Sequence, residues 1–151
     1  MHPIWCIHYV RHQRSRGNLM YKHKGSCHCG EITYHLNTEI MKVVNCHCNF
    51  CRSHSGGAFS TYAALPYDSL EITKGKDNLK SYHAKDAKKH FCNSCGTPIF
   101  NTNNKYRGAC MIYLGTLEKS KDIAPMVNVW CESKLSWIDN VLSVQSNEQG
   151  I

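Results

Sequence analysis

The segment Cys46-His-Cys-Asn-Phe-Cys51 places three cysteines within one short stretch of a chain of 151 residues. Two cysteine pairs flank it, Cys27-His-Cys29 on one side and Cys92-Asn-Ser-Cys95 on the other. Thiolates a few residues apart converge readily on one tetrahedral zinc ion, with Zn–S distances of about 2.3 Å. Four sulfurs close a structural site, whereas three leave one coordination position open, as catalytic zinc sites do. We therefore predict two zinc ions per chain, a structural one held by both pairs and a catalytic one held by the trio.

Chain order supports this sharing of ligands. Cys27 and Cys29 precede the first strong strand pattern, and Cys92 and Cys95 end a later one, so one sheet can bring both pairs together. Gly96 after the last ligand allows the backbone to turn so that amides point at sulfur. Zinc bound there would stabilise the fold, and a chelator would loosen it.

Disulfide bonds and redox chemistry are the two alternatives for these cysteines. Cysteines one residue apart form a mutual disulfide only with strain, and the apolar run from Ile4 to Val10 is too short for a secretory signal. A redox dithiol of the C-x-x-C type usually begins a helix in a β-α-β unit, and no such unit is visible. We therefore expect a reducing, cytoplasmic environment. Outside the clusters, Cys110 and Cys131 lie in apolar runs and are expected to be buried free thiols, and Cys6 lies near the N-terminus.

Length and charge limit the remaining possibilities. A chain of this size fits a single domain, and no apolar run approaches the ~18 residues of a membrane span, so we expect a soluble protein. The formal net charge is +7, and much of it lies in the first 24 residues. We expect residues 1–19 to be a basic, disordered leader, with Met20 as a candidate ancestral start. The charge permits an acidic small molecule or nucleic acid as partner.

From Gly25 onward the pattern is that of a β protein. Ile32, Tyr34 and Leu36 alternate with polar residues, as in a half-buried strand. The full set of expected strands is 31–37, 41–45, 59–65, 70–74, 79–83, 88–92, 98–101, 109–114 and 127–130. Short strands with brief connections predict a mainly β, antiparallel single domain over residues 20–140, followed by a tail over 141–151. Only 69–72 and 117–123 are expected to add a helical turn.

The trio is the candidate site for chemistry. A thiol that enters an open zinc position is held as its thiolate, the nucleophilic form. The alternative is a fourth protein ligand that closes the site, with His47 and His54 as candidates. His54 has the sequence gap of a closed site, whereas His47 lies between two ligands and would point away from the metal on an extended segment.

The ordered motifs resemble the glutathione-dependent formaldehyde-activating enzyme family, which includes centromere protein V. The resemblance covers about residues 21–140 and is carried by Gly25-Ser-Cys-His-Cys-Gly30, Cys46-His-Cys-Asn-Phe-Cys-Arg52, Ser55-Gly-Gly-Ala-Phe59, Phe91-Cys-Asn-Ser-Cys-Gly-Thr-Pro98 and Val129-Trp-Cys-Glu-Ser-Lys-Leu-Ser-Trp137. It implies a beta-tent fold stapled by zinc and the same two zinc sites. It also implies a carbon-sulfur lyase that joins formaldehyde to glutathione.

The residues around the trio suit such a reaction. The glutathione thiolate would attack formaldehyde, and His54, Ser55 or Tyr62 would donate a proton to the alkoxide. Arg52 is a candidate anchor for the carboxylates of glutathione, as is the run of Lys85, Lys88, Lys89 and His90, although a solvated charged face is the simpler interpretation of that run. Trp130 and Trp137 are candidate pocket walls, or simply core residues.

Two positions depart from the pattern that the resemblance brings. Asn128 stands where the family often has a histidine, and Ser136 stands where it often has a proline. The resemblance therefore does not transfer a role of that histidine in glutathione binding or proton transfer to this chain. The alternative function is a zinc-stabilised binding module without catalysis that uses its basic leader to bind nucleic acid or protein. A thiol redox protein is the third class.

Overall fold

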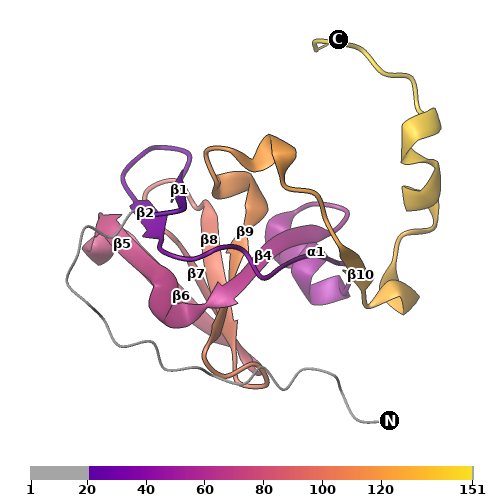
Figure 1. The fold of residues 1–151 in the computed structure, drawn as a ribbon. Coiled ribbons are helices and arrows are strands. Elements are labelled where there is room, and N and C mark those ends of the chain that lie inside the picture. The colour runs from indigo at the N-terminus through magenta and orange to yellow at the C-terminus, as the bar shows by residue number, and fades with distance from the viewer. Residues whose placement is uncertain (1–20, 151) are drawn as a thin grey trace.

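The computed structural model describes residues 21–150, so the predictions for Cys6 and for the leader over residues 1–19 lie outside the described residues. The described chain forms two β-sheets (Figure 1). The small sheet contains β1 (His23–Ser26), β2 (Thr33–Leu36) and β5 (Leu70–Lys74). The large sheet has the order β10 (Val127–Val129), β3 (Lys42–Cys46), β4 (Ser60–Pro66), β9 (Ala109–Tyr113), β8 (Pro98–Asn103), β7 (Ala87–Cys92) and β6 (Leu79–Ala84). The prediction of a mainly β single domain is confirmed.

All nine predicted strands are present, with bounds that shift by up to two residues, and β5 matches its predicted range. β1 was not predicted, because His23-Lys-Gly-Ser26 has no apolar alternation and contains a glycine. It forms because Gly25 lies against the side chain of Tyr34. A Cβ atom at position 25 would lie 2.2 Å from the Tyr34 ring. The absence of a side chain therefore allows this edge strand to pair with β2.

The prediction of a wholly antiparallel arrangement is wrong for one pair, because β10 runs parallel to β3. The chain leaves β9 and crosses over through two 3-10 turns, Leu114–Thr116 and Ser120–Asp122, before it reaches the edge of the large sheet. The second turn falls within the predicted helical range 117–123. A long connection of this kind allows a strand to join its neighbour in the parallel sense, which a tight hairpin cannot do.

The two faces of the large sheet have different roles. One face packs against the small sheet, where the buried side chains of Ile32, Tyr34 and Leu36 confirm the predicted alternation. Ala63 and Leu65 of β4 belong to this core. The opposite face carries a second buried cluster, formed by Cys46, Cys51, Tyr62 and Tyr113, with Cys48, Met111 and Val129 packed against it. Successive strand residues point to opposite faces, so β4 and β9 contribute to both clusters.

One α-helix, α1 (Asn49–Ser55), lies beside β4 on the face of the second cluster (Figure 1). The sequence analysis predicted no helix there. The N-cap is Cys48, whose Sγ accepts a hydrogen bond from the Cys51 amide at 3.3 Å. Gly56, at φ 69°, ends the helix with a hydrogen bond from its amide to the carbonyl of Arg52. The sequence analysis did not predict the start of α1, because cysteine is outside the usual set of N-cap residues.

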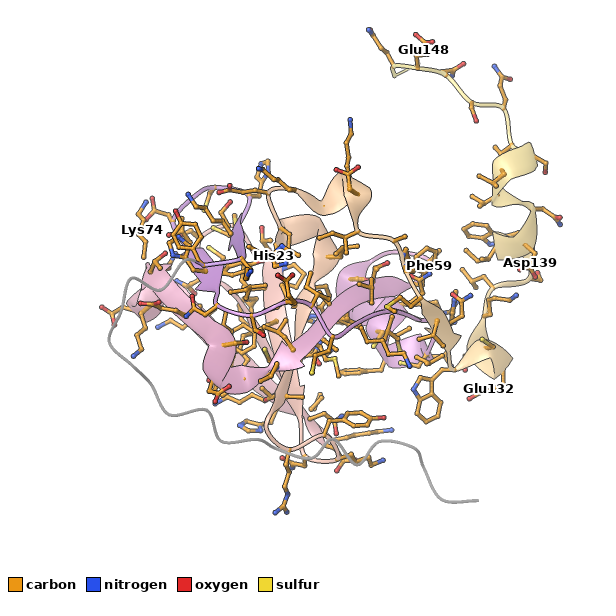
Figure 2. The ribbon with its side chains drawn as sticks, in the orientation of Figure 1. His23, Phe59, Lys74, Glu132, Asp139 and Glu148 are labelled. Carbon is orange, nitrogen blue, oxygen red and sulfur yellow. The ribbon has the colours of Figure 1, made fainter. Side chains whose placement is uncertain are left out.

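After β10 the chain leaves the sheets. It forms two further 3-10 segments, Cys131–Ser133 and Ser136–Ser143, and Figure 1 shows this C-terminal segment in yellow, apart from the body of the domain. Figure 2 shows Glu132, Asp139 and Glu148 along it, whereas Phe59 lies in the body of the domain. Within residues 21–150, no helix has the length and apolar character needed to cross a bilayer.

Candidate metal centre

The two cysteine pairs meet at one end of the fold. Cys27 and Cys29 lie on the turn after β1, Cys92 ends β7, and Cys95 lies on the turn that leads to β8. Their four sulfur atoms all lie within 4.8 Å of one another. Two of the separations are 3.5 Å (Cys27 to Cys29) and 3.8 Å (Cys29 to Cys92). Sulfurs bound tetrahedrally to one zinc ion lie about 3.8 Å apart, so this set fits a closed four-sulfur site.

Hydrogen-bond donors surround these sulfurs. The Ile32 amide donates to Cys27 Sγ at 3.2 Å, and the Asn78 side chain donates to Cys92 Sγ at 3.5 Å. The Thr97 hydroxyl lies 3.1 Å from Cys95 Sγ, and hydrogen bonding from Thr97 is the main cause that lowers the pKa of Cys95 to about 5. Gly96, at φ 74°, makes the turn that aims these groups. Such donors favour thiolates over thiols and orient metal ligands.

The trio occupies the junction of β3 and α1. Cys46 is the last residue of β3, Cys48 caps α1, and Cys51 lies in the first turn of α1. The three sulfurs lie within 4.8 Å of one another, and those of Cys46 and Cys48 are 3.6 Å apart. Every cysteine in residues 21–150 is a free thiol. The arrangement fits a metal with three sulfur ligands.

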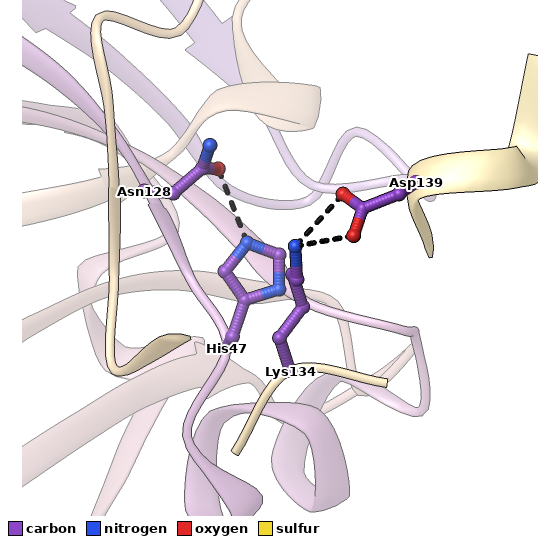
Figure 3. Close-up of polar contacts among 4 residues, drawn as sticks. All are labelled: His47, Asn128, Lys134 and Asp139. Carbon is purple, nitrogen blue, oxygen red and sulfur yellow. Dashed lines mark hydrogen bonds and ion pairs between the residues drawn. The ribbon is translucent and has the colours of Figure 1, made fainter. Parts of the chain in front are cut away.

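Neither candidate for a fourth ligand joins this cluster. His47 is 1% exposed, and its Nε2 donates to Asn128 Oδ1 at 3.1 Å (Figure 3). The Nδ1 of His47 has no partner within the described chain. The Tyr82 hydroxyl and His54 Nδ1 form a hydrogen bond at 2.8 Å, so this ring nitrogen is directed at Tyr82. Within residues 21–150 the cluster therefore consists of three sulfurs alone.

Asn128 holds the segment between the first two ligands of the trio. Its Oδ1 also accepts a hydrogen bond from the Asn45 side chain at 3.1 Å, and Thr61 donates to Asn45 Oδ1 at 2.8 Å. This network joins β10, β3 and β4 and fixes the ring of His47. Figure 3 also shows the ion pair between Lys134 and Asp139, at 2.7 Å, within the C-terminal segment. Asn128 thus has a structural contact at the position where the family pattern often has a histidine.

A buried lysine lies behind the trio. Lys89 of β7 is 2% exposed, so the interpretation of its basic run as a solvated face is wrong at this residue. Its Nζ lies 3.3 Å from Tyr62 Oη and 3.4 Å from Tyr113 Oη. Tyr62 Oη in turn lies 3.3 Å from Cys51 Sγ and 3.2 Å from Tyr113 Oη. One hydroxyl group therefore connects the ammonium to a sulfur of the trio.

These contacts perturb the pKa values of the groups around the trio. Hydrogen bonding from Cys46, and then from Tyr62, with the Lys89 charge, lowers the pKa of Cys51 to about 5 against the opposing effect of burial. The hydrogen bond with Cys51 and burial raise the pKa of Cys46. Burial lowers the pKa of Lys89, and the three thiols oppose this effect when ionised. Burial, and then the Lys89 charge, lower the pKa of His54. The trio thus shares negative charge beside a cation.

The rest of the basic run does not converge on the trio. His90, next to Lys89 on the strand, is buried against the Phe100 ring, with ring centroids 4.0 Å apart, so its solvated interpretation is also wrong. Lys88 is partly exposed, and Lys85 lies at a turn with φ 54°. Neighbouring strand residues point to opposite faces, so Lys88 and His90 point away from the face on which Lys89 meets the trio.

The other predicted site residues have mixed positions. Arg52 of α1 hydrogen-bonds Asn49 Oδ1, and its buried Nε has no partner within the described chain. Ser55 Oγ is bonded to its own helix end, at the Arg52 carbonyl and the Gly57 amide. Trp130 is 57% exposed and Trp137 is 51% exposed, so neither is a core residue.

The two thiols outside the clusters differ from each other. Cys110 is buried, as predicted, and burial raises its pKa to about 12. Cys131 is exposed, so the prediction that it is buried is wrong. Its apolar neighbours suggested a core strand, but Trp130 takes φ 59° and ends β10 there. The following residues belong to the segment that leaves the sheets.

The sequence analysis named Lys89 as one member of a basic run that could anchor glutathione, but it did not place Lys89 behind the trio and did not consider Tyr113. The available signal was the alternation of β9, where Cys110 and Ile112 face the core while Met111 and Tyr113 face the trio. That signal becomes readable only when the strand order is known, because β4, β9, β8 and β7 must be neighbours for Lys89 to reach the tyrosines.

The fold and site define a class of protein, a β domain with one four-cysteine cluster and one three-cysteine cluster that could each hold a metal ion. A family model described as glutathione-dependent formaldehyde-activating enzyme matches residues 22–133. The chain therefore belongs to this family.

Individual relatives are distant. A protein of Talaromyces marneffei is 26% identical over 82 residues, which are 52% of this chain and 44% of that protein. One of Penicillium rubens is 29% identical over 97 residues, which are 58% of this chain and 49% of that protein. Both carry the name "Putative glutathione-dependent formaldehyde-activating enzyme". The chain thus spans about half the length of the curated relatives it matches.

A solved structure supports the fold. The crystal structure of a Rhodobacter sphaeroides protein superposes with a TM-score of 0.58 at 24% identity. The superposition covers 70% of this chain and 98% of the other. At this level of identity the likeness concerns the fold alone.

Proposed function

We propose that this protein is a zinc-dependent carbon-sulfur lyase that joins formaldehyde to glutathione, giving S-hydroxymethylglutathione, or that handles a related adduct of a thiol and an aldehyde. The observation that carries the proposal is the trio, whose three sulfurs converge without a fourth protein ligand in residues 21–150. Membership of the family supports the choice of substrates. The proposal includes a beta-tent domain over residues 20–140, with a leader before it and a tail after it, in the cytoplasm.

Two metal sites with different roles belong to the proposal. Cys27, Cys29, Cys92 and Cys95 would hold a structural zinc ion, and the trio would hold a catalytic one. Thiolate sulfurs at these separations suit zinc. A zinc ion at the trio supplies a position where an incoming thiol is kept as its thiolate at neutral pH.

The chain's own residues then complete the reaction. The thiolate of glutathione attacks the carbonyl carbon of formaldehyde, a C–S bond forms, and the electron pair of the C=O bond moves to oxygen. A proton must reach this oxygen to give the hydroxymethyl product. Of the three candidate donors, we assign this proton to Tyr62, because its Oη lies 3.3 Å from Cys51 Sγ. Ser55 is bonded to its own helix end instead.

Arg52 is the proposed anchor of the substrate. Arg52 follows the last ligand of the trio on α1, and its buried Nε has no partner in the described chain. We assign it to one carboxylate of glutathione, because a guanidinium pairs well with a carboxylate. Trp130 remains a candidate wall of the same site.

The test is direct observation of the adduct. Glutathione and ¹³C-formaldehyde are mixed with the zinc-loaded protein, and exchange between the free and adduct signals is followed by NMR. We expect exchange faster than the spontaneous reaction, and we expect Cys48→Ala to return it to the background rate. Cys131→Ala is the matched control, because Cys131 is exposed and outside both clusters, and it should behave as wild type. No acceleration by the wild-type protein would leave the alternative of a zinc-stabilised binding module.

A further inference from the structure

We propose that Lys89 is the positioning residue that gives the trio its counter-charge, so that the site selects an anionic fourth ligand, a thiolate, over a neutral one. This inference rests on the proposed metal at the trio, and it extends the proposed function by naming what determines the ligand class. Lys89 acts through Tyr62 and is not itself a ligand of the metal.

The first observation is the enclosure of the ammonium. Lys89 is 2% exposed, and two tyrosine hydroxyls accept hydrogen bonds from its Nζ at 3.3 and 3.4 Å. Nζ also lies 4.9 Å from the ring centroid of Phe50, 5.5 Å from that of Tyr62 and 5.7 Å from that of Tyr113. Aromatic faces attract a cation, so this cage holds the ammonium in one place.

The second observation concerns charge balance. None of the ion pairs in residues 21–150 involves Lys89, and its polar contacts are the two tyrosine hydroxyls. A buried charge without an opposite charge nearby is costly. Tyr62 Oη lies within hydrogen-bonding distance of both Lys89 Nζ and Cys51 Sγ, so the trio is the thiolate group that these contacts reach. Lys89 therefore places a buried positive charge beside the thiolates of the trio.

The third observation is the direction of the hydrogen bonds. A tyrosine hydroxyl has one hydrogen to donate. Because Lys89 donates to Tyr62 Oη, that oxygen serves as acceptor, and its own hydrogen is directed at Cys51 Sγ at 3.3 Å or at Tyr113 Oη at 3.2 Å. Tyr113 accepts the other hydrogen bond from Lys89, which leaves its hydrogen free for a further acceptor. The positive charge thus strengthens donation toward the trio.

Counting charges gives the consequence. Zn²⁺ with three thiolates carries a net charge of about −1, and a fourth thiolate makes it about −2, whereas a neutral imidazole leaves it unchanged. A fixed cation nearby stabilises the doubly negative complex more than the singly negative one. Loss of the Lys89 charge should therefore weaken thiolate binding by about tenfold or more and leave imidazole binding nearly unchanged.

The experiment measures two ligands on the same site. The protein is loaded with Co²⁺, whose visible absorption reports a change of ligand, and is titrated with 2-mercaptoethanol and separately with imidazole at one pH. Lys89→Met removes the charge at similar length, and Lys89→Arg retains it. Lys88→Met is the matched control, because its side chain lies on the other face of β7. The four-sulfur site is closed and serves as an internal reference.

We expect the ratio of thiol affinity to imidazole affinity to fall about tenfold or more in Lys89→Met, to recover largely in Lys89→Arg, and to be unchanged in Lys88→Met. Equal weakening of both ligands, or no difference between Met and Arg, would show that Lys89 only fills space and would overturn the inference. If Lys89→Met does not fold, Tyr62→Phe removes the connecting hydroxyl and should lower the same ratio. An unchanged ratio there would also overturn the inference.

The outcome is separable from that of the proposed function. A wild-type protein that shows no NMR acceleration, but whose ligand ratio depends on Lys89, would refute the formaldehyde reaction and keep the selection of anionic ligands. A protein that accelerates the reaction, but whose ligand ratio does not depend on Lys89, would support the formaldehyde reaction and refute the selection of anionic ligands by Lys89.

Discussion

At the level of single residues, Lys88 and Lys89 show that the position of a lysine on its strand determines its environment. They are identical in type and adjacent on β7, yet one is partly exposed and the other is buried between two tyrosines. Strand alternation sends their side chains to opposite faces of the sheet. The chemistry of a lysine near the trio therefore depends on the face on which it lies, and the Lys-Lys dipeptide carries no such information.

His54 provides a test of the charge on Lys89. Burial, and then the Lys89 charge, lower the pKa of His54 from its ordinary value of 6.5. We expect NMR titration of the zinc-loaded protein to give a midpoint below 6.5 for His54, and we expect Lys89→Met to raise it. Lys88→Met should leave the midpoint in place. A midpoint that does not move in Lys89→Met would mean that the lysine is uncharged or screened.

The same shift has a consequence for stability, and its sign follows from proton linkage. A histidine whose pKa is lowered by folding binds fewer protons in the native state than in the unfolded state. His54 therefore makes the free energy of unfolding rise with pH through the region around 6.5, and its stabilising effect is lost as the pH falls below that value. Urea unfolding at pH 7.5 and 5.5 should show a smaller loss of stability for His54→Gln than for wild type. An equal loss of stability in the two proteins would show that His54 does not cause this dependence on pH.

At the level of the elements, close backbone contacts decide where strands can pair. Gly25 of β1 lies against Tyr34 of β2 and forms an isolated bridge with Leu117, so it joins the small sheet to the connection between β9 and β10. Helix α1 depends on local chemistry of a different kind, because its N-cap is Cys48 and its C-cap is Gly56. Loss of the Cys48 sulfur would therefore affect the helix as well as the trio.

Gly25→Ala tests the contact in β1. The added Cβ would lie 2.2 Å from the Tyr34 ring and 2.6 Å from the Thr116 carbonyl oxygen, so the strand or the ring must move. We expect a loss of roughly 2 kcal/mol or more in the free energy of unfolding, measured with denaturant. Gly115→Ala is the control, since a Cβ there meets nothing within 4 Å, and it should change stability by less than about 1 kcal/mol. Similar effects of both substitutions would argue against a tight contact at Gly25.

At the level of the whole molecule, the two cysteine clusters occupy different places relative to the sheets. The four-sulfur cluster joins segments about 60 residues apart, and Cys92 belongs to the core between the sheets. The trio comes from one short stretch at the junction of β3 and α1, on the other face of the large sheet. A metal at the first cluster would connect distant parts of the fold, whereas a metal at the second would not.

Removal of one ligand from each cluster should therefore have unequal effects. We expect Cys92→Ala to lose zinc and to lower the free energy of unfolding by several kcal/mol, because metal binding there contributes to folding. We expect Cys48→Ala to lose one zinc ion per chain while the domain stays folded. Zinc analysis together with circular dichroism of both variants measures this difference. Equal unfolding of the two variants, or a single zinc ion in the wild-type protein, would contradict the division into two roles.

The sequence by itself determined the cysteine clusters, the strands from Thr33 to Val129 and the β class, because ligand spacing and period-two alternation are local properties of the chain. The tertiary structure alone decided that β1 pairs, that β10 runs parallel, that Asn128 holds His47 and that Lys89 faces the trio. These features depend on which strands become neighbours and on which face each side chain lies. Alternation along one strand leaves both choices open until the sheets have assembled.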